Sequence, residues 1–146
     1  MKKVIIILII VISLFTITGC NKKDNKINEK VSDEKVLNIK VNINNKTYNL
    51  SLENNNTVKE FINLLPQEFN MNELNGNEKY VYLDNSLTTN ASNIKHINKG
   101  DVMLYGDDCL VIFYKSFDTS YSYTKIGHID NLEDLGNSTI KVKFEK

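Results

Sequence analysis

Apolar and polar residues alternate between Val36 and Ile43, which is the pattern of a half-buried β-strand. A second run, residues 48–52, alternates in the same way. Asn44-Asn45 lies between the two runs and favours a tight turn, because asparagine tolerates a positive φ angle. The two runs therefore predict a β-hairpin at the start of a folded domain.

A helical pattern follows the hairpin. Thr57 and Glu60 have the spacing of a capping box, in which the threonine accepts from free amides of the first turn and the glutamate reaches back. The apolar residues in this segment recur at helical spacing: Val58, Phe61, Ile62 and Leu65. Pro66 then ends the helix. We expect this to be the main helix of the domain, packed on a sheet.

Most of the remaining chain has the pattern of short strands. The predicted strands are residues 68–74, 79–83, 102–105, 110–114, 125–129 and 138–144. Residues 110–114 are continuously apolar, as in a strand that is buried on both faces. Residues 87–98 are loop-like, and residues 131–135 resemble one helical turn. About eight strands and one main α-helix predict a mostly β fold, a small closed β-barrel.

The amino terminus has a different pattern. Lys2 and Lys3 precede an almost unbroken apolar run, residues 4–17, which fits the apolar region of a secretory signal and is short for a membrane-spanning helix. Thr18, Gly19 and Cys20 follow, which resembles the lipobox of bacterial lipoproteins. The resemblance implies cleavage before Cys20 and lipidation of its thiol, with palmitate as a typical acyl group. An uncleaved membrane anchor is the alternative, and it gives the same topology.

The segment after Cys20 is polar. Between Asn21 and Glu34 only Ile27 and Val31 are apolar, so this stretch cannot bury enough surface to fold, and we expect disorder. The sequence therefore predicts a signal peptide at residues 1–19, the lipidated cysteine and a disordered tether at residues 20–35, and a folded domain at residues 36–146. The expected location is the extracytoplasmic face of the cell membrane, with the membrane as a partner through the lipid.

Charge and cysteine content narrow the function classes. All 18 basic residues are lysines, and 18 acidic residues balance them. No block of positive charge follows the signal, so we predict no nucleic-acid binding. Cys109 lies in an apolar strand beside Asp107 and Asp108, which would raise the pKa of its thiol. We interpret Cys109 as a small buried thiol rather than a nucleophile.

Three segments carry a family resemblance: LNGNEKYVYLDNSLTT, NKGDVMLYGDDCLVIFYKSF and TKIGHIDNLEDL. Within them, the residues that match are Gly100, Asp101, Tyr105, Phe113, Tyr114, Gly127 and Ile129. Together these segments resemble the bacterial cyclophilin-like domain proteins, and the resemblance extends from about Leu37 to Phe144. It implies a small cyclophilin-like β-barrel.

The resemblance does not carry prolyl isomerase activity with it. True cyclophilins use an arginine to polarise the proline amide nitrogen, and this chain has no arginine. Lysine is not an equal substitute, because it is a point donor on a flexible stem. We therefore favour a protein that is not an enzyme, and peptidyl-prolyl isomerisation stays open as an alternative.

Aromatic residues cluster late in the chain. The candidate ligand-binding residues are Tyr105, Phe113, Tyr121, Tyr123 and His128. We place Tyr121-Ser122-Tyr123 in a polar loop, where tyrosines offer a large contact area and a hydrogen-bonding tip. The alternative is that Phe113 belongs to the core, the tyrosines pack at the rim, and His128 is a surface residue.

No metal or cofactor site is predicted. His96 and His128 are far apart and lack the close spacing typical of zinc ligands. The acidic residues near Asp107 and Asp130 do not match an EF-hand loop. No serine nucleophile motif occurs either, so we assign no catalytic residue.

The sequence thus predicts a membrane-anchored extracytoplasmic lipoprotein. Its barrel would be a non-catalytic module that binds a peptide, a protein or another ligand, and we expect a monomer. Two alternatives stay open: a prolyl isomerase that acts on exported proteins, and a lipoprotein with a purely structural role in the cell envelope.

Overall fold

The computed structural model describes residues 37–146 of the chain. The predicted signal peptide, Cys20 and the tether lie outside the described residues. In the part that is described, no helix has the length and apolar character that crossing a membrane requires.

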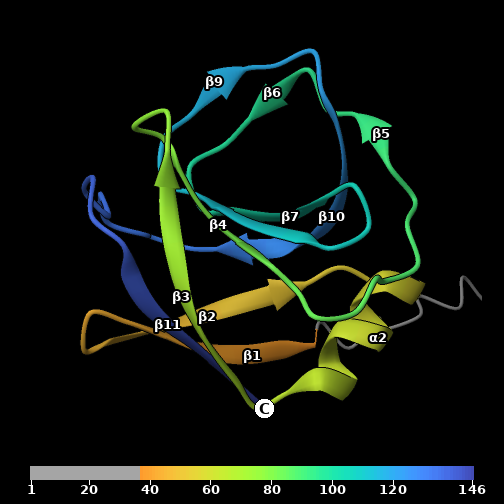
Figure 1. Ribbon diagram of the computed structural model, residues 1–146, viewed down its shortest axis with the longest axis horizontal. Helices are drawn as coiled ribbons and strands as arrows, with labels where there is room; N and C mark the ends of the chain where they lie inside the picture. The colour runs from red at the N-terminus through yellow and green to blue at the C-terminus, as the bar shows by residue number, and fades with distance from the viewer. Residues whose placement is uncertain (1–36) are drawn as a thin grey trace, which may run out of the picture. The chain divides into compact units, whose positions relative to one another are not determined.

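Within residues 37–146, eight antiparallel strands close into a barrel (Figure 1). In chain order they are β1 (Asn38–Ile43), β2 (Lys46–Leu52), β3 (Gln67–Leu74), β4 (Glu78–Tyr82), β7 (Asp101–Tyr105), β8 (Cys109–Phe113), β10 (Ser122–Ile129) and β11 (Ile140–Glu145). Their spatial order is β2-β1-β11-β3-β4-β8-β7-β10, and the pairing of β10 with β2 closes the ring. The predicted mostly β barrel is confirmed.

The predicted hairpin is present as β1 and β2. Asn44 and Asn45 both have positive φ angles, 48° and 64°, as a two-residue turn between strands requires. The apolar face of the hairpin enters the barrel, where Val41 and Leu50 are fully buried.

The helix α2 (Asn56–Leu64) begins earlier than the capping-box pattern predicts. Asn55 is the N-cap, and its side-chain oxygen accepts a hydrogen bond from the amide of Val58 at 2.9 Å. The predicted cap, Thr57, is buried and donates instead to the carbonyl of Thr88 at 2.5 Å. The Glu60 carboxylate also accepts from Thr88, through its amide and its hydroxyl. The capping assignment was therefore wrong, because these two side chains tie the helix to a distant loop.

Two other local predictions were wrong. Residues 131–135 form no helical turn, and Asn131, at the start of the segment, has a left-handed φ of 55°. Leu132 is buried without a helix. Strand β10 begins at Ser122, so Tyr123 belongs to a strand rather than to a polar loop. Its ring packs on Phe113, a long-range contact that the local polar pattern does not reveal.

The predicted loop at residues 87–98 contains two short strands, β5 (Ser92–Asn93) and β6 (His96–Ile97). β5 extends the sheet beyond β10, and β6 pairs with β9 (Phe117–Asp118). In Figure 1, β6 and β9 lie above β7 and β10, away from β1 and β2. These short strands cover part of the outer surface of the barrel.

Strand β8 is buried on both faces, as its continuous apolar run predicts. Leu110 and Ile112 point into the barrel core. Cys109, Val111 and Phe113 point outward into a second, smaller core that also holds Ile97, Met103 and Tyr123. The candidate site lies beside this second core.

Candidate ligand-binding cleft

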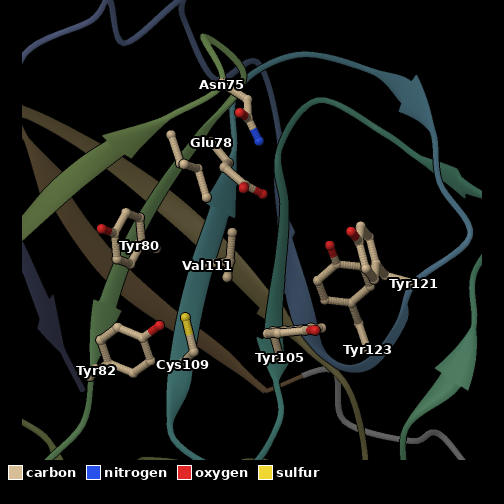
Figure 2. A pocket seen from close by; sticks show the side chains of 10 residues that line it. Asn75, Glu78, Tyr80, Tyr82, Tyr105, Cys109, Val111, Tyr121 and Tyr123 are labelled. Atoms are coloured by element: carbon tan, nitrogen blue, oxygen red, sulfur yellow. The ribbon is translucent and has the colours of Figure 1, made fainter.

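A cleft of about 280 Å³ opens on the outer surface of β4, β8 and β7 (Figure 2). We call it the tyrosine cleft. The residues that line it are Leu74, Asn75, Glu78, Tyr80, Tyr82, Tyr105, Cys109, Val111, Tyr121 and Tyr123. Five of the seven tyrosines of the chain are among them.

Strand register explains why the floor of the cleft is low. Cys109 of β8 lies directly between Tyr82 of β4 and Tyr105 of β7 in the sheet. Directly opposite residues on one face are close enough for their side chains to interact. A small side chain between two large ones leaves a gap, and Figure 2 shows the Cys109 sulfur between the two rings.

The walls of the cleft are held by ring contacts. Tyr80 and Tyr82 lie on the same face of β4, with ring centroids 5.9 Å apart. On the other side, the Tyr105 ring contacts those of Tyr121 at 5.9 Å and Tyr123 at 5.5 Å. These separations are typical of aromatic pairs, so the rings of each wall support one another.

The cleft also concentrates exposed apolar surface. Five large hydrophobic residues are exposed among residues 37–146, and four of them line the cleft: Leu74, Tyr82, Tyr105 and Tyr121. Tyr82 and Tyr121 are the most exposed, at 64% and 61%. Apolar surface gathered at one place is typical of an interaction site.

The structure brings together three of the five residues that sequence reasoning named. Tyr105, Tyr121 and Tyr123 line the cleft. Phe113 does not line it and is fully buried, with its ring 5.5 Å from that of Tyr123. Phe113 therefore supports the wall from behind.

His128 is not part of this cleft. Its Nδ1 lies 2.9 Å from a carboxylate oxygen of Asp101, and its Nε2 lies 3.7 Å from one of Asp130. The other histidine, His96, pairs with Asp118 at 2.6 Å. Among the described residues, no group of three or more histidine, cysteine or acidic side chains is arranged to hold a metal ion.

Sequence reasoning missed the β4 wall, which consists of Glu78, Tyr80 and Tyr82. These three residues alternate with Lys79 and Val81, so a single face of the strand carries two tyrosines and an acid. That alternation was the available signal. The alternation alone does not show that these side chains face Cys109, because the pairing of β4 with β8 joins residues far apart in the chain.

Burial and nearby negative charge act in the same direction on the titratable groups of the cleft. Burial, together with the nearby Glu73, raises the pKa of the Glu78 carboxyl above its usual value. Burial, Asp108 and Glu78 raise the pKa of the Cys109 thiol to about 11, so the thiol is protonated at neutral pH. Burial and Glu78 likewise raise the pKa of Tyr123 to about 12. Cys109 therefore lacks the thiolate character of a nucleophile.

A second hollow of about 210 Å³ adjoins the cleft and shares Asn75, Glu78, Tyr121 and Tyr123 with it. Its other lining residues are Asn77, Phe117, Asp118, Thr119 and Ser120. The side-chain oxygen of Asn77 is buried and has no hydrogen-bond partner. The two hollows together form a site with an aromatic half and a polar half.

Comparison with known families gave one match. The family model described as the cyclophilin-like family matches residues 41–145, which include all eight barrel strands in whole or in part. Neither the curated proteins nor the solved structures gave a match to the chain.

Proposed function

Because this chain belongs to the cyclophilin-like family, we propose that its barrel is a non-catalytic module that binds a short peptide segment of another protein in the tyrosine cleft. The observation that carries the proposal is the gathering of exposed tyrosines around the small side chain of Cys109. Tyrosine is suited to such contacts, since it combines a large apolar ring with a polar tip.

The size of the two adjoining hollows suits a short peptide segment. The tyrosine cleft, at about 280 Å³, suits one or two side chains. The adjoining hollow of about 210 Å³ offers amides and hydroxyls to the polar backbone that would flank those side chains.

The chemistry of the site favours binding over catalysis. The chain has no arginine to polarise a proline amide nitrogen. The Cys109 thiol is protonated at neutral pH and has acidic rather than basic neighbours. What the cleft offers is contact area, hydrogen-bonding phenols and one carboxylate.

We further propose that this module is anchored to the extracytoplasmic face of the cell membrane through a lipid on Cys20. The support is the sequence of residues 1–20 alone: two lysines, an apolar run and the Thr18-Gly19-Cys20 motif. Two acyl chains hold a protein stably at a bilayer, whereas one holds it marginally.

A peptide array tests the binding proposal. The full-length protein in nonionic detergent is applied to overlapping peptides from the extracytoplasmic proteins of the same cell. We expect wild type and Cys109→Ser to retain a common subset of peptides. Cys109→Leu should retain them at least about tenfold less, because the larger side chain fills the gap between Tyr82 and Tyr105.

A second variant guards against misfolding of Cys109→Leu. Tyr121→Ala removes an exposed ring from the wall and should weaken the same peptides without unfolding the domain. If wild type retains no peptide, or if both variants retain the same peptides as wild type, the cleft is not a peptide site and the structural-lipoprotein alternative is favoured.

A prolyl-peptide isomerisation assay tests the enzymatic alternative. With the catalytic arginine of cyclophilins absent from the chain, the full-length protein should not accelerate cis–trans exchange above the uncatalysed rate. Clear acceleration that Cys109→Leu abolishes would replace the binding proposal with an isomerase acting in the same cleft.

A further inference from the structure

We propose that the tyrosine cleft selects a cationic side chain, so that the bound peptide presents a lysine between Tyr82 and Tyr105 with its ammonium group directed towards Glu78. This inference rests on the proposed peptide-binding function and adds the chemical class of the group that is recognised.

The first step is the spacing of the two rings. Neighbouring strands lie about 4.8 Å apart, so the backbones of β4 and β7, with β8 between them, are about 10 Å apart. A lysine stem above Cys109 would therefore lie in the gap between Tyr82 and Tyr105, where its methylenes can pack along both side chains while the ammonium group points out of the gap. Figure 2 shows the rings of Tyr82 and Tyr105 on opposite sides of the Cys109 sulfur.

The second step is the charge of the lining. Glu78 is the acidic residue among the ten described residues that line the cleft, and none of the ten is a lysine, arginine or histidine. Figure 2 places Glu78 and Asn75 at one end of the cleft, beyond the tyrosine walls. A lysine whose stem lies between the rings can reach this carboxylate with its charged end.

The third step is that Glu78 lacks a partner inside the domain. Lysines elsewhere on residues 37–146 form ion pairs with Glu68, Glu133, Asp134 and Glu145. No such pair or hydrogen bond is made by the half-buried Glu78 carboxylate within that same range. A partly buried carboxylate without a partner loses hydration and gains no hydrogen bond in return. An incoming ammonium group would provide that hydrogen bond and an opposite charge.

The remaining side chains oppose other occupants. An acidic side chain in the cleft would be repelled by Glu78, and an apolar one would desolvate that carboxylate further. Burial is the main cause of the raised pKa values of Cys109 and Tyr123, and the negative charge of Glu78 adds to both. A cation is favoured by the same field that disfavours a thiolate or a phenolate.

The adjoining hollow fits the neutral part of the peptide. The side-chain amide of Asn75 and the hydroxyls of Thr119 and Ser120 line this hollow and can form hydrogen bonds with a peptide backbone. Its carboxylate, Asp118, already lies 2.6 Å from His96. The aromatic half of the site would therefore bind the charged side chain, while the polar half contacts the peptide backbone.

Three matched probes test the inference: Nα-acetyl-lysine methylamide, its norleucine analogue, which lacks the ammonium group, and the glutamate analogue. Each is titrated into the full-length protein in nonionic detergent, and amide chemical shifts of β4, β7 and β8 are followed by nuclear magnetic resonance. The lysine probe should bind about tenfold more tightly than the norleucine probe, and the glutamate probe should not bind. Added salt should weaken the lysine probe most.

Two variants locate the effect. Glu78→Gln should reduce binding of the lysine probe to the level of norleucine, whereas Glu53→Gln removes one charge at an exposed position outside the cleft and should have no effect. Equal binding of lysine and norleucine would overturn the inference, as would lysine binding that survives Glu78→Gln or no binding of the lysine probe at all. The peptide array decides the binding function separately, since peptides held through apolar side chains alone would still be retained there.

Discussion

At the scale of single residues, Glu78 is where stability and binding conflict. Its carboxyl lines one end of the tyrosine cleft (Figure 2), and burial with Glu73 nearby raises its pKa. A glutamine of the same shape would avoid the cost of ionising a partly buried acid. The conflict is expected where a charge is kept for a ligand rather than for the fold.

Glu78→Gln should therefore raise the melting temperature at pH 7. Because the folded-state pKa is above the usual 4.5, the folded state binds the proton more tightly than the unfolded state. The penalty of ionisation is absent below the unfolded pKa, grows as pH rises through the folded pKa, and is complete above it. The advantage of the variant should thus be largest at neutral pH and vanish near pH 3, as measured by thermal unfolding across that range.

The exposed variant Glu53→Gln serves as the comparison and should leave the melting temperature nearly unchanged at each pH. A wild type that is more stable than Glu78→Gln at pH 7 would show that the Glu78 carboxylate is stabilised by contacts in the folded state.

Lys79 is the opposite case, a charge that serves the fold. It is fully buried on the inner side of β4, and its ammonium group donates to the carbonyls of Gly136 at 2.6 Å and Ser138 at 2.7 Å. The same group lies 5.2 Å from the centre of the Tyr114 ring. These contacts fix the segment before β11 against the barrel.

Replacing Lys79 with methionine keeps the apolar stem and removes the donor. Two carbonyls lose their partner, each at a cost of about 1–3 kcal/mol, so we expect a loss of about 2–6 kcal/mol in the free energy of unfolding. Lys125→Met, at an exposed position on β10, should change it by less than about 0.5 kcal/mol. Urea unfolding measures both, and equal stability of Lys79→Met and wild type would contradict the role assigned to these bonds.

At the scale of elements, β10 closes the barrel by pairing with β2 on one side and β7 on the other. The register shifts between Lys125 and Gly127, which is a β-bulge. At Gly127 the backbone of β2 comes so close that an added Cβ would collide with the carbonyl oxygen of Ser51 and a methyl group of Leu50. Only glycine lets the two strands approach at this point.

Gly127→Ala should consequently destabilise the domain by about 1–3 kcal/mol, the usual cost of forcing extra atoms into a packed site. Chemical denaturation measures the effect. Gly106→Asn is the matched control, because Gly106 has a left-handed φ of 64° that asparagine tolerates and no atom lies within 4 Å of an added Cβ. A Gly127→Ala variant as stable as Gly106→Asn would mean that β2 and β10 can separate without loss.

At the scale of the whole molecule, the proposed anchor and the barrel have separate roles. The barrel supplies the site, and residues 20–35 would hold it clear of the membrane surface as a polar tether. A cleft that selects lysine would then bind peptides of the cell envelope. This arrangement depends on Cys20.

Cys20→Ala should abolish incorporation of labelled fatty acid. The variant should run as an unprocessed precursor on a denaturing gel, and no mature lipoprotein should be found in the membrane fraction. Cys109→Ser is the matched control and should be lipidated and processed normally, since Cys109 is buried in the second core. Unchanged processing and membrane retention of Cys20→Ala would contradict the anchor.

Features that depend on neighbouring positions were predicted correctly, whereas features that depend on distant contacts were not. The local sequence correctly predicted the turn at Asn44-Asn45 and the doubly buried strand β8, because both depend on adjacent positions. The capping box predicted from Thr57 and Glu60 was wrong, because both side chains form hydrogen bonds with Thr88, which is distant in sequence. Tyr82 was missed for a similar reason, since its place in the cleft depends on the pairing of β4 with β8, which puts it beside Cys109.

The amino-acid sequence by itself determined that this protein is a mostly β barrel with a main helix, since alternation and turn residues are local properties that each segment carries with it. It also named three of the tyrosines. Only the tertiary structure decided that these tyrosines face Tyr80, Tyr82 and Glu78 across one small cysteine, and that His128 lies apart from them. The physical reason is that a binding site depends on strand register and barrel closure, and both are set by contacts between residues far apart in the chain.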